Sequence, residues 1–77
     1  MSKSDEILYE LDYTKRICIY DKEEIYRERF LNTKNEEIMF DLYNKVINIT
    51  TTAGEIDMKL LKAINEKCKE LGWLDEQ

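Results

Sequence analysis

Apolar residues recur at helical spacing near the end of the sequence. The apolar arc that they form on a helix consists of Ile56, Leu60, Leu61, Ile64, Cys68 and Leu71. Asp57, directly after Ile56, is placed as the N-cap, where a carboxylate can accept a backbone N–H of the first turn. Gly72 can end the helix in a left-handed conformation, and Trp73 can then fold back onto Cys68. The pattern predicts an amphipathic helix with its arc turned inward, and it places Lys67 at the edge of the arc with its ammonium in water.

The middle of the chain alternates between apolar and polar residues with a period of two. Three segments, RICIY, EEIMFDL and KVINITT, each place their larger apolar residues on one face of a strand. These residues are Ile17 and Ile19 in the first segment, Ile38 and Phe40 in the second, and Ile47 and Ile49 in the third. The segment IYRERFL is more polar and suits a strand with one wet face. Residues 43–45 form a turn between two of these segments, with Asn44 as the residue suited to a positive φ. An antiparallel meander of three or four strands is therefore expected.

The first residues fit two patterns. Ile7, Tyr9 and Leu11 alternate as in a strand, whereas Ile7, Leu8 and Leu11 also share one helical face. Ser2 followed by an acid three residues later is typical of a helix start, so we favour a short helix over residues 4–11. The fold class is then α+β, with one domain over residues 1–77. It comprises a short N-terminal helix, an antiparallel β-meander of three or four strands and a C-terminal amphipathic helix packed on one sheet face.

The charge balance bears on the choice of partner. The chain has 77 residues, 12 of them basic and 17 acidic, for a net charge of −5. Such a chain has no long-range attraction for nucleic acid or anionic lipid, so we expect neither as a direct partner. No uncharged run is long enough to span a bilayer and no apolar leader is present, so we expect a cytoplasmic protein.

Several chemistries lack their residues. The sequence contains no histidine, which removes the Ser-His and Cys-His couples, and its two glycines are isolated, which removes a phosphate-binding loop. Cys18 and Cys68 cannot complete a zinc site, and in a reducing compartment we expect both as free thiols. Glu36 and Glu37 are neighbours on a strand and point to opposite faces. We therefore expect a protein that is not an enzyme and that has no metal site and no cofactor.

Tyrosine and arginine are the residue types that mark candidate partner-binding positions, because both are enriched at protein interfaces. Tyr20, Tyr26 and Tyr43 can share the sheet face opposite the isoleucines, and Arg27 and Arg29 share one strand face that would flank them. In a second interpretation, the rings cover the rim of a small core. The arginines would then pair across strands with Glu36 or Asp41.

The terminal segment LLKAINEKCKELGWL resembles a loose group of small uncharacterised phage and prophage proteins of Gram-positive bacteria. Their final helix carries an L-x-A-I-x-x-K-x-x-E-L-G-W type ending, matched here by Leu61, Ala63, Ile64, Lys67, Glu70, Leu71, Gly72 and Trp73. The segment YELDYTK is similar to the end of their first helix, often written E-L-G-Y, with Asp12 in place of the glycine. FDLYNKVINI is similar to their last hairpin. The resemblance implies a helix–meander–helix layout and a phage origin, and it implies no activity.

Three functions remain open at this point. We expect a small acidic phage or prophage accessory protein that acts by protein–protein binding, with a host or phage protein as its partner. One alternative is an acidic mimic of nucleic acid that inhibits a host DNA- or RNA-binding protein. The other is a self-associating structural protein, such as a homodimer that shares the arc of the last helix.

Overall fold

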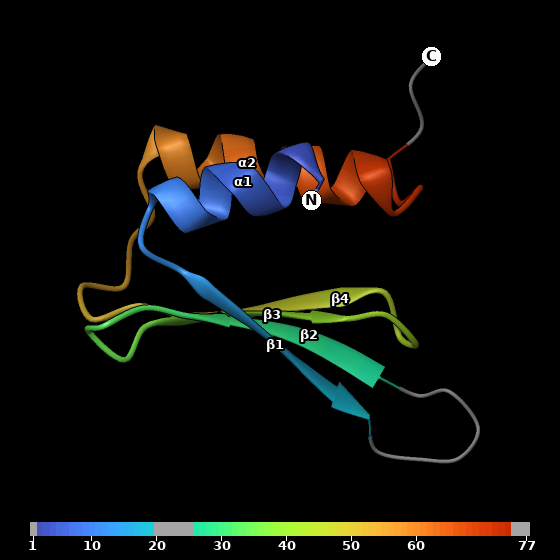
Figure 1. The fold of residues 1–77 in the computed structure, drawn as a ribbon, viewed down its shortest axis with the longest axis horizontal. Helices are drawn as coiled ribbons and strands as arrows, with labels where there is room; N and C mark the ends of the chain where they lie inside the picture. Colours follow the sequence, from blue (N-terminus) through green and yellow to red (C-terminus); the bar gives the residue numbers. More distant parts are fainter. Residues whose placement is uncertain (1, 20–25, 75–77) are drawn as a thin grey trace.

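The computed structural model describes residues 2–19 and 26–74. Its elements, in chain order, are α1 (Lys3–Glu10), β1 (Thr14–Ile19), β2 (Tyr26–Leu31), β3 (Glu37–Asp41), β4 (Val46–Thr50) and α2 (Met58–Glu70). The four strands form one antiparallel sheet in the order β1-β2-β3-β4, and both helices lie side by side above the same face of it (Figure 1). The predicted α+β architecture is confirmed, with four strands in the meander.

Both helices begin at a capping side chain. The Ser2 hydroxyl accepts the Asp5 backbone N–H at 3.2 Å, and the Asp57 carboxylate accepts that of Leu60 at 2.9 Å. Each cap satisfies a backbone donor that the first turn would otherwise leave without a partner. The first segment is therefore a helix, as favoured from the sequence.

The two helices also end in the same way. Gly72 has φ +76°, and the Trp73 N–H donates to the Cys68 carbonyl at 2.9 Å. At the end of α1, Asp12 has φ +74°, and the Tyr13 N–H donates to the Leu8 carbonyl at 2.9 Å. Both are Schellman endings, in which the left-handed residue turns the chain back and an aromatic residue follows it into the core. The predicted stop at Gly72 and the inward fold of Trp73 are confirmed.

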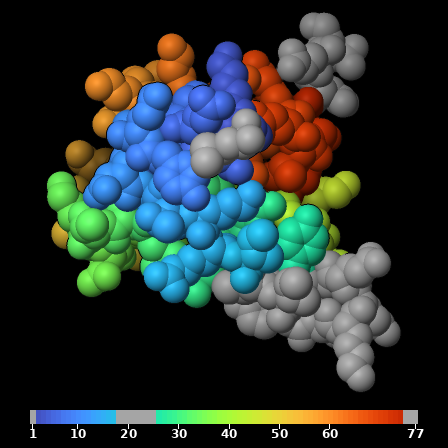
Figure 2. All heavy atoms as spheres, in the orientation of Figure 1, coloured from blue at the N-terminus to red at the C-terminus, as the bar shows by residue number. Residues whose placement is uncertain are grey.

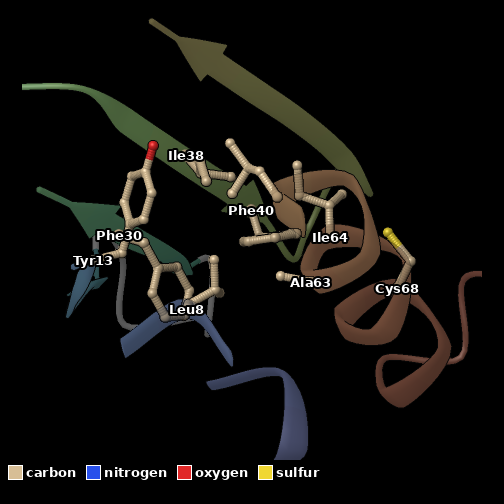
Figure 3. Close-up of a cluster of buried hydrophobic side chains, with 9 residues drawn as sticks. Leu8, Tyr13, Phe30, Ile38, Phe40, Ala63, Ile64 and Cys68 are labelled. Carbon is tan, nitrogen blue, oxygen red and sulfur yellow. The ribbon is translucent and has the colours of Figure 1, made fainter. Parts of the chain in front are cut away.

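The core lies between the helix layer and the sheet. Phe30 and Phe40 meet edge to face with 5.8 Å between ring centroids, and the Trp73 ring lies 6.4 Å from that of Phe40. The buried hydrophobic cluster, most of which is drawn in Figure 3, consists of Leu8, Tyr13, Phe30, Ile38, Phe40, Leu60, Ala63, Ile64 and Cys68. Ile47 of β4 packs against this cluster, so both helices and the strands β2, β3 and β4 share one core within the described residues.

Three details of the prediction are corrected. The arc of α2 is rotated from the predicted one: Leu61 is 36% exposed, and Lys67, expected in water, is only 5% exposed. Ile56 lies before the helix and is 37% exposed. In the β3–β4 turn the positive φ of +59° falls on Lys45, because Asn44 instead donates its backbone N–H and its side-chain amide to the Asp41 carboxylate.

Candidate functional site

In the described part of the chain both helices lie over one face of the sheet (Figure 1), and we call the opposite face the open face. Strand register places Arg16, Arg29, Met39 and Asn48 in one row across this face, and Arg27, Asp41 and Val46 in the next. Residues paired directly across antiparallel strands point to the same side of the sheet. All three arginines of the sequence therefore project from the open face of an acidic protein.

Two of these arginines are held by carboxylates on β3. Arg27 Nε lies 3.4 Å from Asp41 Oδ2, and Arg29 Nη2 lies 2.5 Å from Glu37 Oε1. The predicted cross-strand pairing is confirmed for Arg27 with Asp41. Arg29 pairs with Glu37 and not with Glu36, because the Glu36 carboxylate accepts the Thr52 backbone N–H at 3.0 Å and so lies at the end of the sheet.

Asp41 is the best-fixed of these acids. It is 2% exposed and accepts the backbone N–H groups of Tyr43 at 3.1 Å and Asn44 at 2.9 Å. The hydrogen bonds from Asn44, together with Tyr43 and the charge of Arg27, lower the pKa of the Asp41 carboxyl below its ordinary value. A carboxylate that stays ionised and immobile orients the Arg27 guanidinium over the open face.

Arg16 differs from the other two arginines. It is exposed, and it makes no ion pair within the described part of the chain, residues 2–19 and 26–74. Its direct partner across the β1–β2 ladder is Arg29. Like charges in this position repel each other and destabilise a sheet. The open face therefore has two like charges opposite each other, those of Arg16 and Arg29, and we call this pair the charge conflict.

The predicted tyrosine face is not formed. Tyr26 alternates with Glu28 and Phe30, so it shares the helix-covered face and is half-buried there. Tyr43 lies in the β3–β4 turn and is 64% exposed. Tyr20 lies outside the described residues. The prediction that Tyr26 lies opposite the isoleucines was wrong because Phe30, two residues further on, is a core side chain and fixes Tyr26 to its side.

Four charged side chains meet between the helices and the covered face of the sheet, two from the helices and two from the strands. Lys67 Nζ is 2.7 Å from Glu28 Oε1 and 3.3 Å from Asp5 Oδ1, and Lys15 Nζ is 3.1 Å from Asp5 Oδ2 and 3.4 Å from Glu28 Oε1. The Lys67–Glu28 approach is short but poorly aligned for a hydrogen bond, so the attraction is mainly that of an ion pair. We call these residues the charge quartet.

The quartet has a structural role. It joins α1, β1, β2 and α2, and in the space-filling view the atoms of α1 lie directly on those of β1 (Figure 2). The Lys67 ammonium also lies 5.6 Å from the Phe30 ring centroid and 5.9 Å from that of Phe40. Each charge faces two opposite charges, which offsets the cost of removing it from water. None of the quartet residues lines the hollow described below.

The remaining sequence expectations concern thiols, metals and membranes. Cys68 is a free, buried thiol, as predicted, and burial raises its pKa; the Cys18 side chain lies outside what the structure describes. Within the described ranges, no three acidic or cysteine side chains converge as a metal site would require. None of the helices in that part of the chain has the length and apolar character needed to cross a bilayer.

No protein-family model, curated protein or solved structure matches this chain. Sequence reasoning found Arg27 and Arg29 but missed Arg16 as the third member of the open face. A signal was present, since Arg16 precedes Ile17 and so points away from the face that the isoleucines share. The missing piece was the β1–β2 register, which sets Arg16 beside Arg29 and which the segment between the strands does not specify.

Proposed function

We propose that this protein is a small accessory protein, of phage or prophage origin and acting in the cytosol, that binds another protein through the open face. The observation that carries the proposal is the gathering of all three arginines on that face, with Arg16 set against Arg29. Arg27 and Arg29 have carboxylates of the same sheet as partners, whereas Arg16, which faces Arg29 across the ladder, has no ion pair within the described residues. An acidic partner surface would give Arg16 an opposite charge.

The surroundings of the arginines suit a protein partner. Arginine is among the residues that most often dominate binding energy, and fixed side chains lose little entropy on binding. Arg27 and Arg29 are already oriented by Asp41 and Glu37. Val46, 49% exposed, follows in the same row as Arg27 and adds apolar area at the edge of the face. The partner that fits is a protein surface with carboxylates opposite the arginines and an apolar patch to one side, opposite Val46.

The acids give less support to mimicry of a nucleic acid. A mimic must present free carboxylates as a phosphate backbone does, yet most acids in the described ranges are bonded within the protein. Those so engaged are Asp5, Asp12, Glu28, Glu36, Glu37, Asp41, Asp57, Glu66 and Glu70. In that part of the chain, Glu6, Glu10 and Glu55 are the acids that make no bond of this kind.

The test is capture of partners from a host lysate by immobilised protein, with two variants of equal charge change. Arg16→Glu alters the open face, whereas Lys62→Glu alters an exposed position on α2, on the other side of the molecule. We expect Arg16→Glu to lose the captured protein and Lys62→Glu to retain it. If both variants lose the captured protein equally, the interaction depends only on net charge and the open face is not its site. If only Lys62→Glu loses the captured protein, the open face is rejected as the binding surface.

A second candidate function is self-association, and the free edge of β4 favours it. β4 pairs only with β3, and no charged residue occurs between Lys45 and Glu55. Ile49 is 40% exposed beside this edge. Natural sheets usually protect such an edge with charge or proline, because it can pair with another strand. The arc of α2, by contrast, packs within its own chain.

Sedimentation measurements test the edge. If two chains pair through β4, the wild-type protein will sediment as a dimer at high concentration, and Asn48→Lys, which puts a charge on the exposed edge strand, will sediment as a monomer. A wild-type monomer at every concentration would remove this candidate. Asn65→Lys, the same substitution at an exposed position of α2, is the matched control.

A further inference from the structure

A hollow of about 320 Å³ lies at the end of the molecule opposite the β3–β4 turn. Three separate segments wall it: the end of α1, the β2–β3 turn and the loop that leads into α2. Leu11, Ile56 and Leu60 supply its apolar lining. This volume is at the lower end of the range of small-ligand sites, so the hollow suits a group no larger than a long side chain.

Four carboxyl side chains surround the hollow, against the single ammonium of Lys34: Asp12, Glu36, Glu55 and Asp57. Three of them are fixed by other bonds. Asp12 accepts from the Thr33 hydroxyl at 2.9 Å, Glu36 from the Thr52 N–H at 3.0 Å, and Asp57 caps α2. Asp12 and Asp57 each use one oxygen in these bonds, so the other oxygen can accept from a bound group.

Tyr13 distinguishes this hollow from an ordinary cluster of surface acids. Its side chain is 5% exposed and lines the hollow, and its hydroxyl makes no hydrogen bond with any residue of the described ranges. Figure 3 shows the hydroxyl pointing away from the Leu8 side chain, out of the core cluster. Burial raises the pKa of Tyr13, and the charges of Glu36 and Asp57 raise it further, so the phenol stays neutral. The Tyr13 oxygen is not one of the fully buried atoms that lack a partner, so it opens into the hollow, where a bound group can replace water as its hydrogen-bond partner.

We propose that this hollow binds a primary ammonium group carried on an alkyl chain, such as the side chain of lysine or one end of a polyamine. The ammonium has three N–H donors, which match the Tyr13 oxygen and the open oxygens of Asp57 and Asp12. The alkyl stem lies along Leu11, Ile56 and Leu60. An anion is repelled by the carboxylates, and a neutral alcohol leaves them without a counter-charge. The site is separate from the open face, so it can fail without affecting the proposed function.

Titrations followed by amide chemical shifts test the site on the full chain, with n-butylammonium chloride as probe. We expect saturable shifts at Tyr13, Glu36, Thr52 and Asp57, with a Kd on the order of millimolar, as for other ligands of a few heavy atoms. 1-Butanol tests the apolar stem alone, and sodium chloride at equal ionic strength tests screening alone. Shifts of the same size and position with either control would overturn the proposal.

Two variants separate binding from folding. Tyr13→Phe removes only the hydroxyl, so it should leave the melting temperature unchanged or higher while weakening n-butylammonium binding about fivefold. Asp57→Asn keeps a good helix cap and removes one charge, so it should weaken binding severalfold while the circular dichroism spectrum is retained. Glu6→Gln, which removes an exposed charge away from the hollow, is the matched control and should bind as the wild type does. An unchanged Kd in Tyr13→Phe would reject the site.

The source of the ammonium is decided by two further probes. Acetyl-Gly-Lys-Gly-amide presents a lysine side chain on a backbone, and 1,5-diaminopentane presents a free diamine. Tripeptide binding as tight as that of n-butylammonium assigns the hollow to a lysine of a bound protein. Binding of the diamine without binding of the tripeptide assigns it to a free polyamine. Binding of neither overturns the proposal.

Discussion

Lys67 is the residue on which most of the buried charge depends. The residue is 5% exposed, and its ammonium contacts both carboxylates of the quartet and lies near two aromatic rings of the core. A lone buried ammonium would be far costlier than an apolar side chain of the same size. The position is tolerated because Asp5 and Glu28 arrive from two other elements, so α2 is docked by charge as well as by apolar area.

Lys67→Met should destabilise the protein by about 3–5 kcal/mol, because it leaves two buried carboxylates with Lys15 alone. Urea unfolding followed by circular dichroism measures the loss. Lys69→Met, on the exposed side of the same helix, is the matched control and should stay within about 0.5 kcal/mol of the wild type.

The Lys67→Met/Glu28→Gln double variant should recover part of the lost stability, because it removes one of the two buried carboxylates that Lys67→Met leaves without their main counter-charge. A single variant as stable as the wild type would show that the quartet contributes nothing to stability.

The quartet also predicts a pH dependence. Burial alone would raise the pKa of Asp5, but the hydrogen bond from Lys15 and the charges of Lys67 and Lys15 outweigh it and hold that pKa below its ordinary 3.8. A lowered folded-state pKa contributes stability that is present above pH 3.8 and is lost as the pH falls through the folded-state value. The melting temperature should therefore decline in acid.

Asp5→Asn isolates this contribution. The variant should melt at a lower temperature at neutral pH and should lose less on acidification than the wild type does. Some acid sensitivity will remain, because hydrogen bonds to Asn44 and Ser4 contribute to lowering the pKa values of Asp41 and Glu70. An acid slope identical to that of the wild type would mean that Asp5 is not a linked group.

The ends of the two helices form a natural comparison at the scale of the element. Both use a Glu-Leu-x-aromatic sequence, with Asp12 in the left-handed position of α1 and Gly72 in that of α2. Left-handed backbone is strained for a residue with a Cβ, although aspartate tolerates it better than most. The Asp12 carboxylate compensates in part by accepting from the Thr33 hydroxyl.

Exchanging residue types at these positions should move stability in opposite directions. Asp12→Gly should raise the free energy of unfolding by about 0.5 kcal/mol, since strain is relieved and only an exposed hydrogen bond is lost. Gly72→Ala should lower it by about 1 kcal/mol. A Cβ at Gly72 would meet no atom within 4 Å, so the loss would come from the backbone conformation and not from a clash. Thermal melts of the two variants measured side by side will show whether the signs differ.

Much of each element could be predicted from sequence. Asp57, Gly72 and Trp73 are local signals, and the structure uses each of them as predicted. The arc of α2 was rotated in the prediction because Lys67 was assigned to water by its charge, whereas its partners come from distant segments. For the same reason the sequence did not predict that Glu28, a charged residue, lies buried on the covered face of β2. Periodicity cannot recognise a charge whose compensation is long-range.

At the scale of the whole molecule, the candidate site depended on register. The sequence places Arg27 and Arg29 on one strand face, but only the pairing of β1 with β2 brings Arg16 beside them. Tyr26 lies on the covered face because it alternates with the core residue Phe30, so the proposed partner surface is one of arginines and not of tyrosines. Register between short strands of mixed polarity is weakly specified by local pattern, and here the core contacts of Phe30 settle it.

The open face should therefore cost the free protein some stability, and this can be measured without knowing the partner. Arg16→Glu replaces a like-charge pair across the β1–β2 ladder with an opposite pair to Arg29, so it should raise the free energy of unfolding by about 0.5–1 kcal/mol. Arg16→Ala removes the repulsion without adding attraction, so its free energy of unfolding should lie between those of the wild type and Arg16→Glu. The differences should shrink in high salt, since exposed charges are screened.

The control for net charge is Lys62→Glu, which changes the charge by the same amount on exposed α2, where no arginine faces it. Its melt should not rise as that of Arg16→Glu does. A gain in stability at Arg16 together with a loss of partner capture is the signature of a residue kept for binding at the expense of folding. If Arg16→Glu melts below the wild type, Arg16 already stabilises the isolated chain, and the charge conflict on which the open face is proposed would not exist.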